Sequence, residues 1–369
     1  MPFSLELPSH RPFECHTYCD SVKPEDVARI FAKKKLTAQD FLALISDAAQ
    51  PFLEQMATRA QSATRTFFGN AIVLFTPLYA ANICENRCLY CSFAQQNKIT
   101  RKKMTQSEIA AAADRITHTG VRHVLLLTGE SRTATPVSYL AMALSTLRKK
   151  CAALTIEVYP LLQEEYAECV ASGADGLTIY QETYEPATYA HVHAGGPKAD
   201  YAFRIDAPER GLAAGMRSVT IGPLFGLADW RGEAYATALH IDYLQKKFPE
   251  AEIGVSFPRI RPLVAEFNPT HPIDDRRLVQ VMLAMRIFAP SLGMTVTTRE
   301  SAPFRDGITP LCITKMSAGV STAVGGDDEA SQGQFEISDT RSLGQMCADL
   351  EKMGLQPVLH DWNNRLTRS

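Results

Sequence analysis

The chain has 369 residues, and its 38 Lys and Arg residues against 40 Asp and Glu residues leave a formal charge of −2. That balance argues against a bulk nucleic-acid partner, which would favour a strongly basic surface. Hydrophobic residues make up 46% of the chain, too many for a disordered protein. No apolar run approaches the ~18–20 residues that span a bilayer, and the first residues lack the pattern of a secretory signal. We therefore expect a soluble cytoplasmic protein.

Residues 1–69 are predicted to form a helical extension. Apolar residues recur at helical spacing over 23–34 and again over 37–67. Thr37 and Asp40 have the spacing of a capping box, with a shorter acid than usual. A helix is therefore expected to begin just after Thr37.

From residue 70 onward, short apolar runs alternate with longer amphipathic stretches. We predict eight strands, over 71–79, 123–128, 154–159, 176–180, 218–221, 252–257, 295–298 and 312–317. Helices are predicted between most of them, over 106–117, 136–149, 164–171, 200–214, 233–247 and 274–288. Parallel strands need such crossovers, and eight units in about 250 residues is the size of a closed barrel. The prediction is an α/β protein with a TIM-type (β/α)8 barrel over 70–320, followed by a loop and helix over 321–369 packing on it.

Residues capable of chemistry follow most of the predicted strands. They are Gly129 and Glu130, Glu157, Glu182, Arg259, Arg299 with Glu300, and Ser317. In a barrel the C-terminal ends of the strands meet at one mouth, where active sites lie. Polar residues that merely end strands are the alternative interpretation.

The nine cysteines include three within eight residues, Cys84, Cys88 and Cys91. An odd number without an export signal disfavours a disulfide framework. Three thiolates with no fourth ligand nearby do not close a tetrahedral zinc site, and they leave one iron of a 4Fe–4S cluster open. A site completed by a remote cysteine such as Cys312 is the alternative.

This Cys-x3-Cys-x2-Cys motif, with Tyr90 before the last cysteine, resembles the signature of the radical S-adenosylmethionine (SAM) superfamily. Further segments resemble a narrower family within it, the tyrosine lyases of the 2-iminoacetate synthase (ThiH) type. These segments are 69–70, 77–79, 127–130, 180–184, 196–198, 229–231, 256–262, 298–301, 317–319, 334–335, 354–358 and 361–362. The resemblance implies a 4Fe–4S cluster on the three cysteines and SAM bound to its open iron.

The resemblance also implies roles for the mouth residues in binding SAM. The expected contacts are Tyr90 beside the adenine, Gly129 and Glu130 at the methionine ammonium, Glu157 at the ribose hydroxyls, and Glu182 with Arg204 at the amino-acid end. Tyr90 as an ordinary core aromatic is compatible with its role. For Arg204, an exposed helix charge is the alternative.

The implied substrate is L-tyrosine, whose carboxylate suits a guanidinium held at the barrel mouth. Arg299 is the first candidate, with Arg259 and Arg261 as alternatives, and one of the three is expected to pair with an acid such as Glu300 or Glu182. Further hydrogen bonds are expected from Ser256, Thr297 and Ser317. The implied reaction breaks the Cα–Cβ bond and yields 2-iminoacetate and 4-methylphenol, for the thiazole of thiamine.

The resemblance implies transfer of 2-iminoacetate to the thiazole synthase ThiG and an electron donor such as flavodoxin or ferredoxin, with no membrane or nucleic acid involved. A related enzyme that makes carbon monoxide and cyanide carries a second cysteine cluster near its C-terminus. No cysteine follows Cys347 here, so release of 2-iminoacetate is the expected endpoint. A sister lyase acting on tryptophan and a non-catalytic iron–sulfur scaffold remain alternatives; converging Glu130, Glu157 and Arg299 favour an enzyme.

Overall fold

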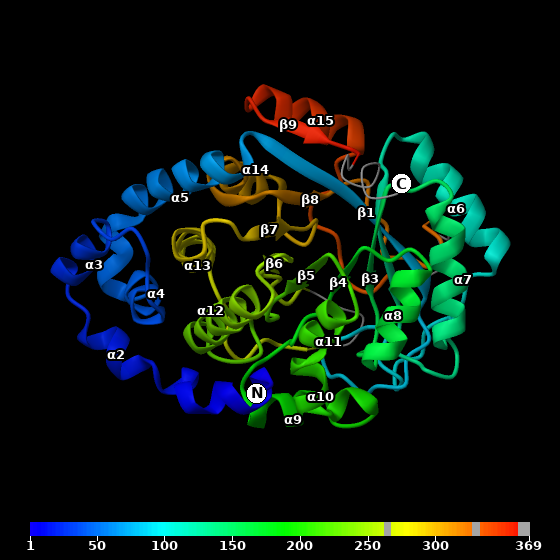
Figure 1. The fold of residues 1–369 in the computed structure, drawn as a ribbon, viewed down its shortest axis with the longest axis horizontal. Coiled ribbons are helices and arrows are strands. Elements are labelled where there is room, and N and C mark those ends of the chain that lie inside the picture. Colours follow the sequence, from blue (N-terminus) through cyan, green and yellow to red (C-terminus); the bar gives the residue numbers. More distant parts are fainter. Residues whose placement is uncertain (262–266, 327–332, 361–369) are drawn as a thin grey trace.

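A closed barrel of eight parallel strands forms the centre of the protein (Figure 1). The structure is a computed structural model that describes residues 1–261, 267–326 and 333–360. The strands are β1 (Ala71–Ala81), β2 (His123–Thr128), β3 (Ala153–Glu157), β4 (Gly176–Thr178), β5 (Ser218–Ile221), β6 (Glu252–Ser256), β7 (Gly293–Val296) and β8 (Lys315–Ser317). β1 pairs with both β8 and β2, which closes the barrel. The predicted (β/α)8 fold is confirmed.

Helices surround the strands as the crossover rule requires. They are α6 (Gln106–His118), α7 (Val137–Arg148), α8 (Gln163–Ala171), α9 (Pro186–Val192), a 3-10 turn (Pro197–Ala199), α10 (Tyr201–Ile205), α11 (Ala207–Ala213), α12 (Trp230–Lys247), α13 (Asp275–Phe288) and α14 (Ala302–Cys312). The single helix predicted over 200–214 is wrong. Pro208 has no N–H for the Arg204 carbonyl, so the helix divides at Asp206 into α10 and α11.

The N-terminal residues curve around the outside of α12, α13 and α14 (Figure 1). They form α1 (Phe3–Glu6), two 3-10 turns (Leu7–His10 and Pro12–Glu14), α2 (His16–Ser21), α3 (Pro24–Ile30), α4 (Ala38–Leu44), a third turn (Asp47–Phe52) and α5 (Leu53–Phe68). The capping box is confirmed, because Thr37 accepts from the Asp40 N–H and Asp40 accepts from that of Thr37. The helical spacing over 37–67 belongs to two helices, since the third turn, which contains Pro51, separates α4 from α5.

After the barrel, the described residues form α15 (Leu343–Lys352) and β9 (Gln356–Val358). β9, which the sequence did not predict, pairs in parallel with the first residues of β1. In the described ranges no helix is long and apolar enough to cross a membrane. Two of the segments that carry the resemblance are affected by the limits of the described residues. Segment 361–362 lies outside them, and segment 256–262 lies partly outside them.

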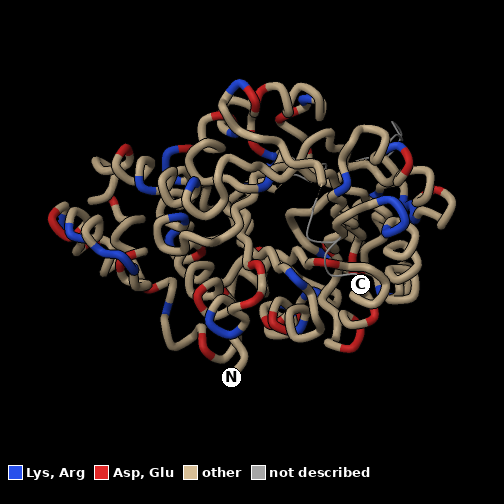
Figure 2. The backbone as a smooth tube through the Cα atoms, turned by 45° about the horizontal axis from the view of Figure 1, so that its top comes forward, with Lys and Arg blue, Asp and Glu red and all other residues tan. Residues whose placement is uncertain are grey.

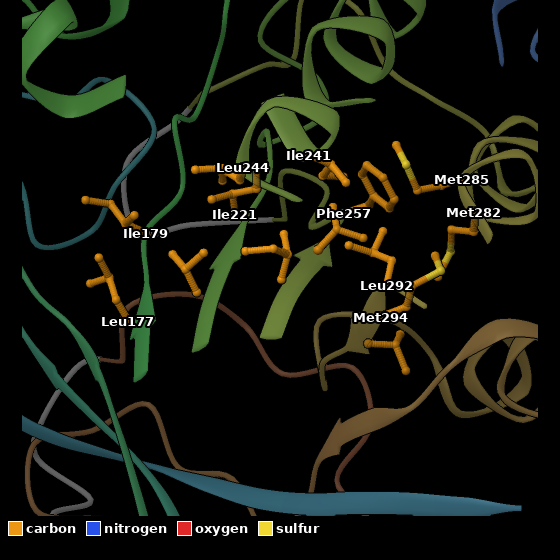
Figure 3. Close-up of a cluster of buried hydrophobic side chains, with 14 of the residues drawn as sticks. Leu177, Ile179, Ile221, Ile241, Leu244, Phe257, Met282, Met285, Leu292 and Met294 are labelled. Atoms are coloured by element: carbon orange, nitrogen blue, oxygen red, sulfur yellow. The ribbon is translucent and has the colours of Figure 1, made fainter. Parts of the chain in front are cut away.

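The main apolar layer lies between the strands and the helices around them. Figure 3 shows Leu177, Ile179, Ile221, Phe257, Leu292 and Met294 from the strand layer beside Ile241, Leu244, Met282 and Met285 from α12 and α13. Charged residues of both signs are interspersed around the outside of the backbone (Figure 2). Burial of this layer fixes the strands, and so fixes where the residues that end them lie.

Candidate active site

A cavity of about 950 Å³ occupies the barrel interior. Its lining runs from the loops after the strands, where Cys88 and Arg299 lie, to the other ends of the strands, where His123 lies. TIM-barrel interiors are ordinarily filled by bulky branched side chains. Here the lining includes Gly254 of β6 and Gly293 of β7, and a Cβ at Gly254 would lie 2.9 Å from the Thr220 hydroxyl oxygen, so this glycine makes room for a neighbouring side chain.

All three motif cysteines line this cavity, and none forms a disulfide. Among the described residues no three His, Cys, Asp or Glu side chains lie close enough to share one metal ion. Separated thiols that face a common space fit a polynuclear cluster, in which each thiolate binds a different iron. Cys312 is not a lining residue; it ends α14, with its Sγ 3.9 Å from the Ile308 carbonyl oxygen. The geometry therefore does not support Cys312 as a fourth ligand.

Four charged side chains meet beside the cysteines in a buried cluster with no net charge. Glu130 accepts a hydrogen bond from Arg204 Nη1 at 2.9 Å, and Lys198 Nζ donates to Glu182 Oε1 at 2.7 Å. Lys198 also lies 3.5 Å from Glu130, and Arg204 lies 3.6 Å from Glu182. Arg204 is 5% exposed, so the alternative of a solvated helix charge is wrong.

This pairing keeps the four charged side chains ionised although they are buried. Burial raises the pKa of Glu130, but Lys198 and Arg204 outweigh it and lower that pKa to about 2. Burial likewise opposes the charge of Lys198, yet the two carboxylates raise its pKa above the ordinary value. Fixed charges of both signs suit a zwitterionic amino-acid group such as the methionine end of SAM.

Asn86, inside the cysteine motif, connects the cysteine loop to the charged cluster. Its Nδ2 donates to Glu130 Oε2 and its Oδ1 accepts from the Lys198 N–H, both at 2.8 Å. A Cβ at Gly196 would lie 2.5 Å from Asn86 Oδ1, and its φ of +93° also favours glycine. No role was predicted for Asn86 or Lys198, although Lys198 belongs to a segment that carries the resemblance.

The Glu182 backbone is strained, with a φ of +71° that non-glycine residues seldom adopt. The two residues that follow Glu182 are held by Glu233 of α12. The Glu233 carboxylate accepts hydrogen bonds from the Thr183 hydroxyl and, at 3.0 Å, from the Tyr184 N–H. Strain of this kind persists where the surroundings over-determine it, commonly at binding sites. Sequence reasoning missed Glu233, because a single acid at the start of a helix ordinarily reads as a dipole or capping residue.

Tyr90 and Gly129 both lie at the cavity wall. Tyr90 is buried, and its hydroxyl lies 2.7 Å from His193 Nε2. At Gly129 a Cβ would lie 2.3 Å from the Ile83 carbonyl oxygen. The absence of a side chain at Gly129 is therefore required first by the cysteine loop, whereas the sequence analysis attributed it to a ligand.

The three candidate arginines differ sharply in their surroundings. Arg259 and Arg261 both pair with Glu300, and Arg259 also pairs with Asp275 at 2.7 Å. Neither is a lining residue of the cavity. Arg299 lines it and lies 3.5 Å from the centre of the Phe335 ring, with no ion-pair partner among the described residues. Of the three candidates, only Arg299 therefore lines the cavity.

The remaining predicted residues divide between the cavity and the wall behind it. Glu157, Thr297 and Ser317 line the cavity. The Ser317 hydroxyl already accepts from the Thr298 N–H at 3.1 Å. Ser256 is buried and is not a lining residue, so the geometry does not place it against a ligand.

We expect Glu157→Gln to change how stability depends on pH. Burial and then Glu182 raise the pKa of Glu157 from its ordinary 4.5 to about 7, so folding takes up a proton between these values. The contribution of Glu157 to the free energy of unfolding of the parent protein therefore falls as pH rises through this window. The variant has no such loss, so its stability relative to the parent should increase from pH 4.5 to 7. Denaturant titrations of ligand-free protein measure the difference; a constant difference would contradict the raised pKa.

The fold and site define a radical SAM barrel. Residues 78–235 match the family model described as the Radical SAM superfamily, whose members use a 4Fe–4S cluster and SAM, and residues 256–356 match the Biotin and Thiamin Synthesis associated domain. The chain is 41% identical to 2-iminoacetate synthase of Escherichia coli strain K12 over 347 residues, 93% of this chain and 92% of that protein. It belongs to the 2-iminoacetate synthase family.

Solved structures agree with this assignment. The hydrogenase maturase HydG superposes with a TM-score of 0.91 at 28% identity, covering 98% of this chain and 82% of that one. Methylornithine synthase (PylB) superposes with a TM-score of 0.71 over 90% of this chain and 97% of that one, at 18% identity, and so shares the fold.

Proposed function

We propose that this protein is a radical SAM lyase that cleaves the Cα–Cβ bond of L-tyrosine to 2-iminoacetate and 4-methylphenol. The observation that carries the proposal is the position of Arg299, which lies in the same cavity as Cys84, Cys88 and Cys91 and has no ion-pair partner in the part of the chain that the structure describes. A guanidinium fork binds a carboxylate at two points, so it would orient an amino acid against the cluster side of the cavity. Membership of the 2-iminoacetate synthase family supports this substrate and bond.

The chain's residues provide for both ligands. Cys84, Cys88 and Cys91 would hold the cluster, which together with SAM supplies a 5′-deoxyadenosyl radical. The charged cluster around Glu130 and Glu182 would bind the amino-acid end of SAM. In this proposal Glu157 would bind the ribose hydroxyls and Tyr90 would lie beside the adenine. An enclosed site keeps a reactive radical away from water.

The apolar side chains of two strands in the cavity wall suit the ring of tyrosine. β1 and β2 present Phe75, Leu125 and Leu127 to the cavity. With the ring in apolar contact there, the substrate carboxylate would be bound by Arg299, with Thr297 and Ser317 beside it. In this proposal the Cα–Cβ bond would lie between the contacts to the ring and the contacts to the carboxylate.

Partners complete the proposal. The match to the Biotin and Thiamin Synthesis associated domain supports a place in thiamine synthesis, with 2-iminoacetate passed to the thiazole synthase ThiG. Flavodoxin or ferredoxin is the proposed electron donor. A cytoplasmic location stays a prediction from the sequence.

Anaerobic turnover tests the function directly. Reconstituted protein with SAM, reductant and L-tyrosine is expected to form 4-methylphenol, 2-iminoacetate and 5′-deoxyadenosine, separated by chromatography. Cleavage of tryptophan but not of tyrosine would identify the sister lyase instead. A protein that assembles the cluster but binds no SAM would be a scaffold.

SAM affinity is expected to fall in Glu130→Gln and Glu157→Ala while the cluster is retained. Loss of a hydrogen bond to a charged group costs about 1.5–3 kcal/mol, roughly ten- to hundredfold in affinity. Anaerobic equilibrium titration measures the change. Glu164→Gln, on the exposed side of α8, is the matched control. Parent affinity in both test variants would contradict the assigned SAM contacts.

A further inference from the structure

A short segment beyond β8 reaches into the cavity and touches both sides of the site. Gln334 and Phe335 line the cavity although they lie outside the eight barrel units. Phe335 stacks on Arg299, on the side proposed for the substrate. Gln334 faces the cysteine side, where its Nε2 lies 3.9 Å from Cys91 Sγ. Neighbouring residues of one segment thus contact the two functional halves.

The orientation of the Gln334 amide is set by a second contact. The Tyr79 hydroxyl, from β1, donates to Gln334 Oε1 at 2.9 Å. Because the oxygen accepts there, the NH2 group is the end directed at Cys91. Tyr79 is itself buried and packs edge-on against Phe93, two residues after Cys91, with ring centres 6.0 Å apart.

The segment is tightly seated, so this contact is not that of a loose side chain. A Cβ at Gly333 would lie 2.1 Å from the Thr322 hydroxyl oxygen. That same hydroxyl donates to the Phe335 carbonyl at 3.3 Å. The backbone on both sides of Gln334 is therefore held against the preceding loop.

We propose that Gln334 is a positioning residue that raises the reduction potential of the 4Fe–4S cluster by donating an N–H to the Cys91 thiolate. Hydrogen bonds to the sulfurs are among the factors that set the potential of an iron–sulfur cluster. The reduced cluster carries one more negative charge, so a donor stabilises it more than the oxidised form and raises the reduction potential. The inference rests on the proposed function only in taking Cys91 as a cluster ligand.

The test is a potentiometric titration of the reconstituted protein without tyrosine, followed by electron paramagnetic resonance of the reduced cluster. Gln334→Leu is expected to lower the ratio of reduced to oxidised cluster about fivefold at a given potential, because it removes one ordinary hydrogen bond to the reduced cluster. At 59 mV per tenfold for one electron, the midpoint becomes about 40 mV more negative.

Two further variants decide the outcome even if Gln334→Leu loses its cluster. Tyr79→Phe removes the hydrogen bond that orients the Gln334 amide. It is expected to make the midpoint potential more negative, by less than Gln334→Leu does. Gln356→Leu, an exposed glutamine on β9, is the matched control and should keep the parent midpoint. A parent midpoint in Tyr79→Phe, and in Gln334→Leu where it assembles, would overturn the proposal. Failure of the proposed function is distinct: it would appear as absent tyrosine cleavage in the parent protein.

Discussion

Replacement of Cys84, Cys88 or Cys91 by Ala is expected to abolish SAM cleavage. Each thiolate would bind a different iron, so loss of any one leaves an iron without a protein ligand. All three line one cavity and none has another covalent partner. Iron and sulfide content, the visible spectrum and 5′-deoxyadenosine formation after anaerobic reconstitution measure the effect, which should bring the product below detection.

The other six cysteines supply the controls. They are Cys15, Cys19, Cys151, Cys169, Cys312 and Cys347, and the structure places none of them at the cavity. Their Ala variants should assemble a cluster at near the parent content. A missing 4Fe–4S spectrum in a folded Cys312→Ala protein would contradict the three-ligand site.

Arg299→Lys is expected to uncouple the reaction. Lysine keeps the positive charge but lacks the planar fork that binds a carboxylate at two points. A substrate misplaced by about 1 Å can react a hundredfold more slowly. The variant should therefore form 5′-deoxyadenosine without a matching amount of 4-methylphenol, while cluster content and SAM affinity stay near those of the parent. Both products are quantified from the same anaerobic reaction.

Arg259→Lys and Arg261→Lys are the controls that the geometry provides. Both parent side chains pair with Glu300, which is 4% exposed on its side chain, and neither lines the cavity. Their variants are expected to lose thermal stability but keep the two products in proportion. If Arg299→Lys stays coupled while one of these variants loses 4-methylphenol formation, the carboxylate partner is that neighbour.

Strand positions were largely predictable because buried strands produce apolar runs. β2 and β5 begin and end where the sequence placed them. The helix α14 was missed because Gly307 and Pro310 lie inside it, and both residues disfavour helix interiors. Packing against α5 and α13 overrides that local preference, and it moves Cys312 from the predicted strand into the helix.

The charged residues of the site are distinguished by pairing between residues far apart in the sequence. An exposed helix charge was the alternative interpretation of Arg204, and it is excluded because Arg204 pairs with Glu130, 74 residues away. Glu300 engages Arg259 and Arg261 and so leaves only Arg299 of the three candidates facing the cavity. No periodicity or spacing encodes such choices.

The barrel, the cysteine motif and the acids and arginines at the barrel mouth were predictable from the sequence, because periodic burial and closely spaced ligands are local properties of a chain. Which of these charges pair with one another, and which stay available to a ligand, depends on the folded structure. The folded structure also brought in Asn86, Lys198 and Glu233, which position the predicted residues through contacts across loops. Buried charges require partners at hydrogen-bond distance, and that distance is set only when the strands close into a barrel.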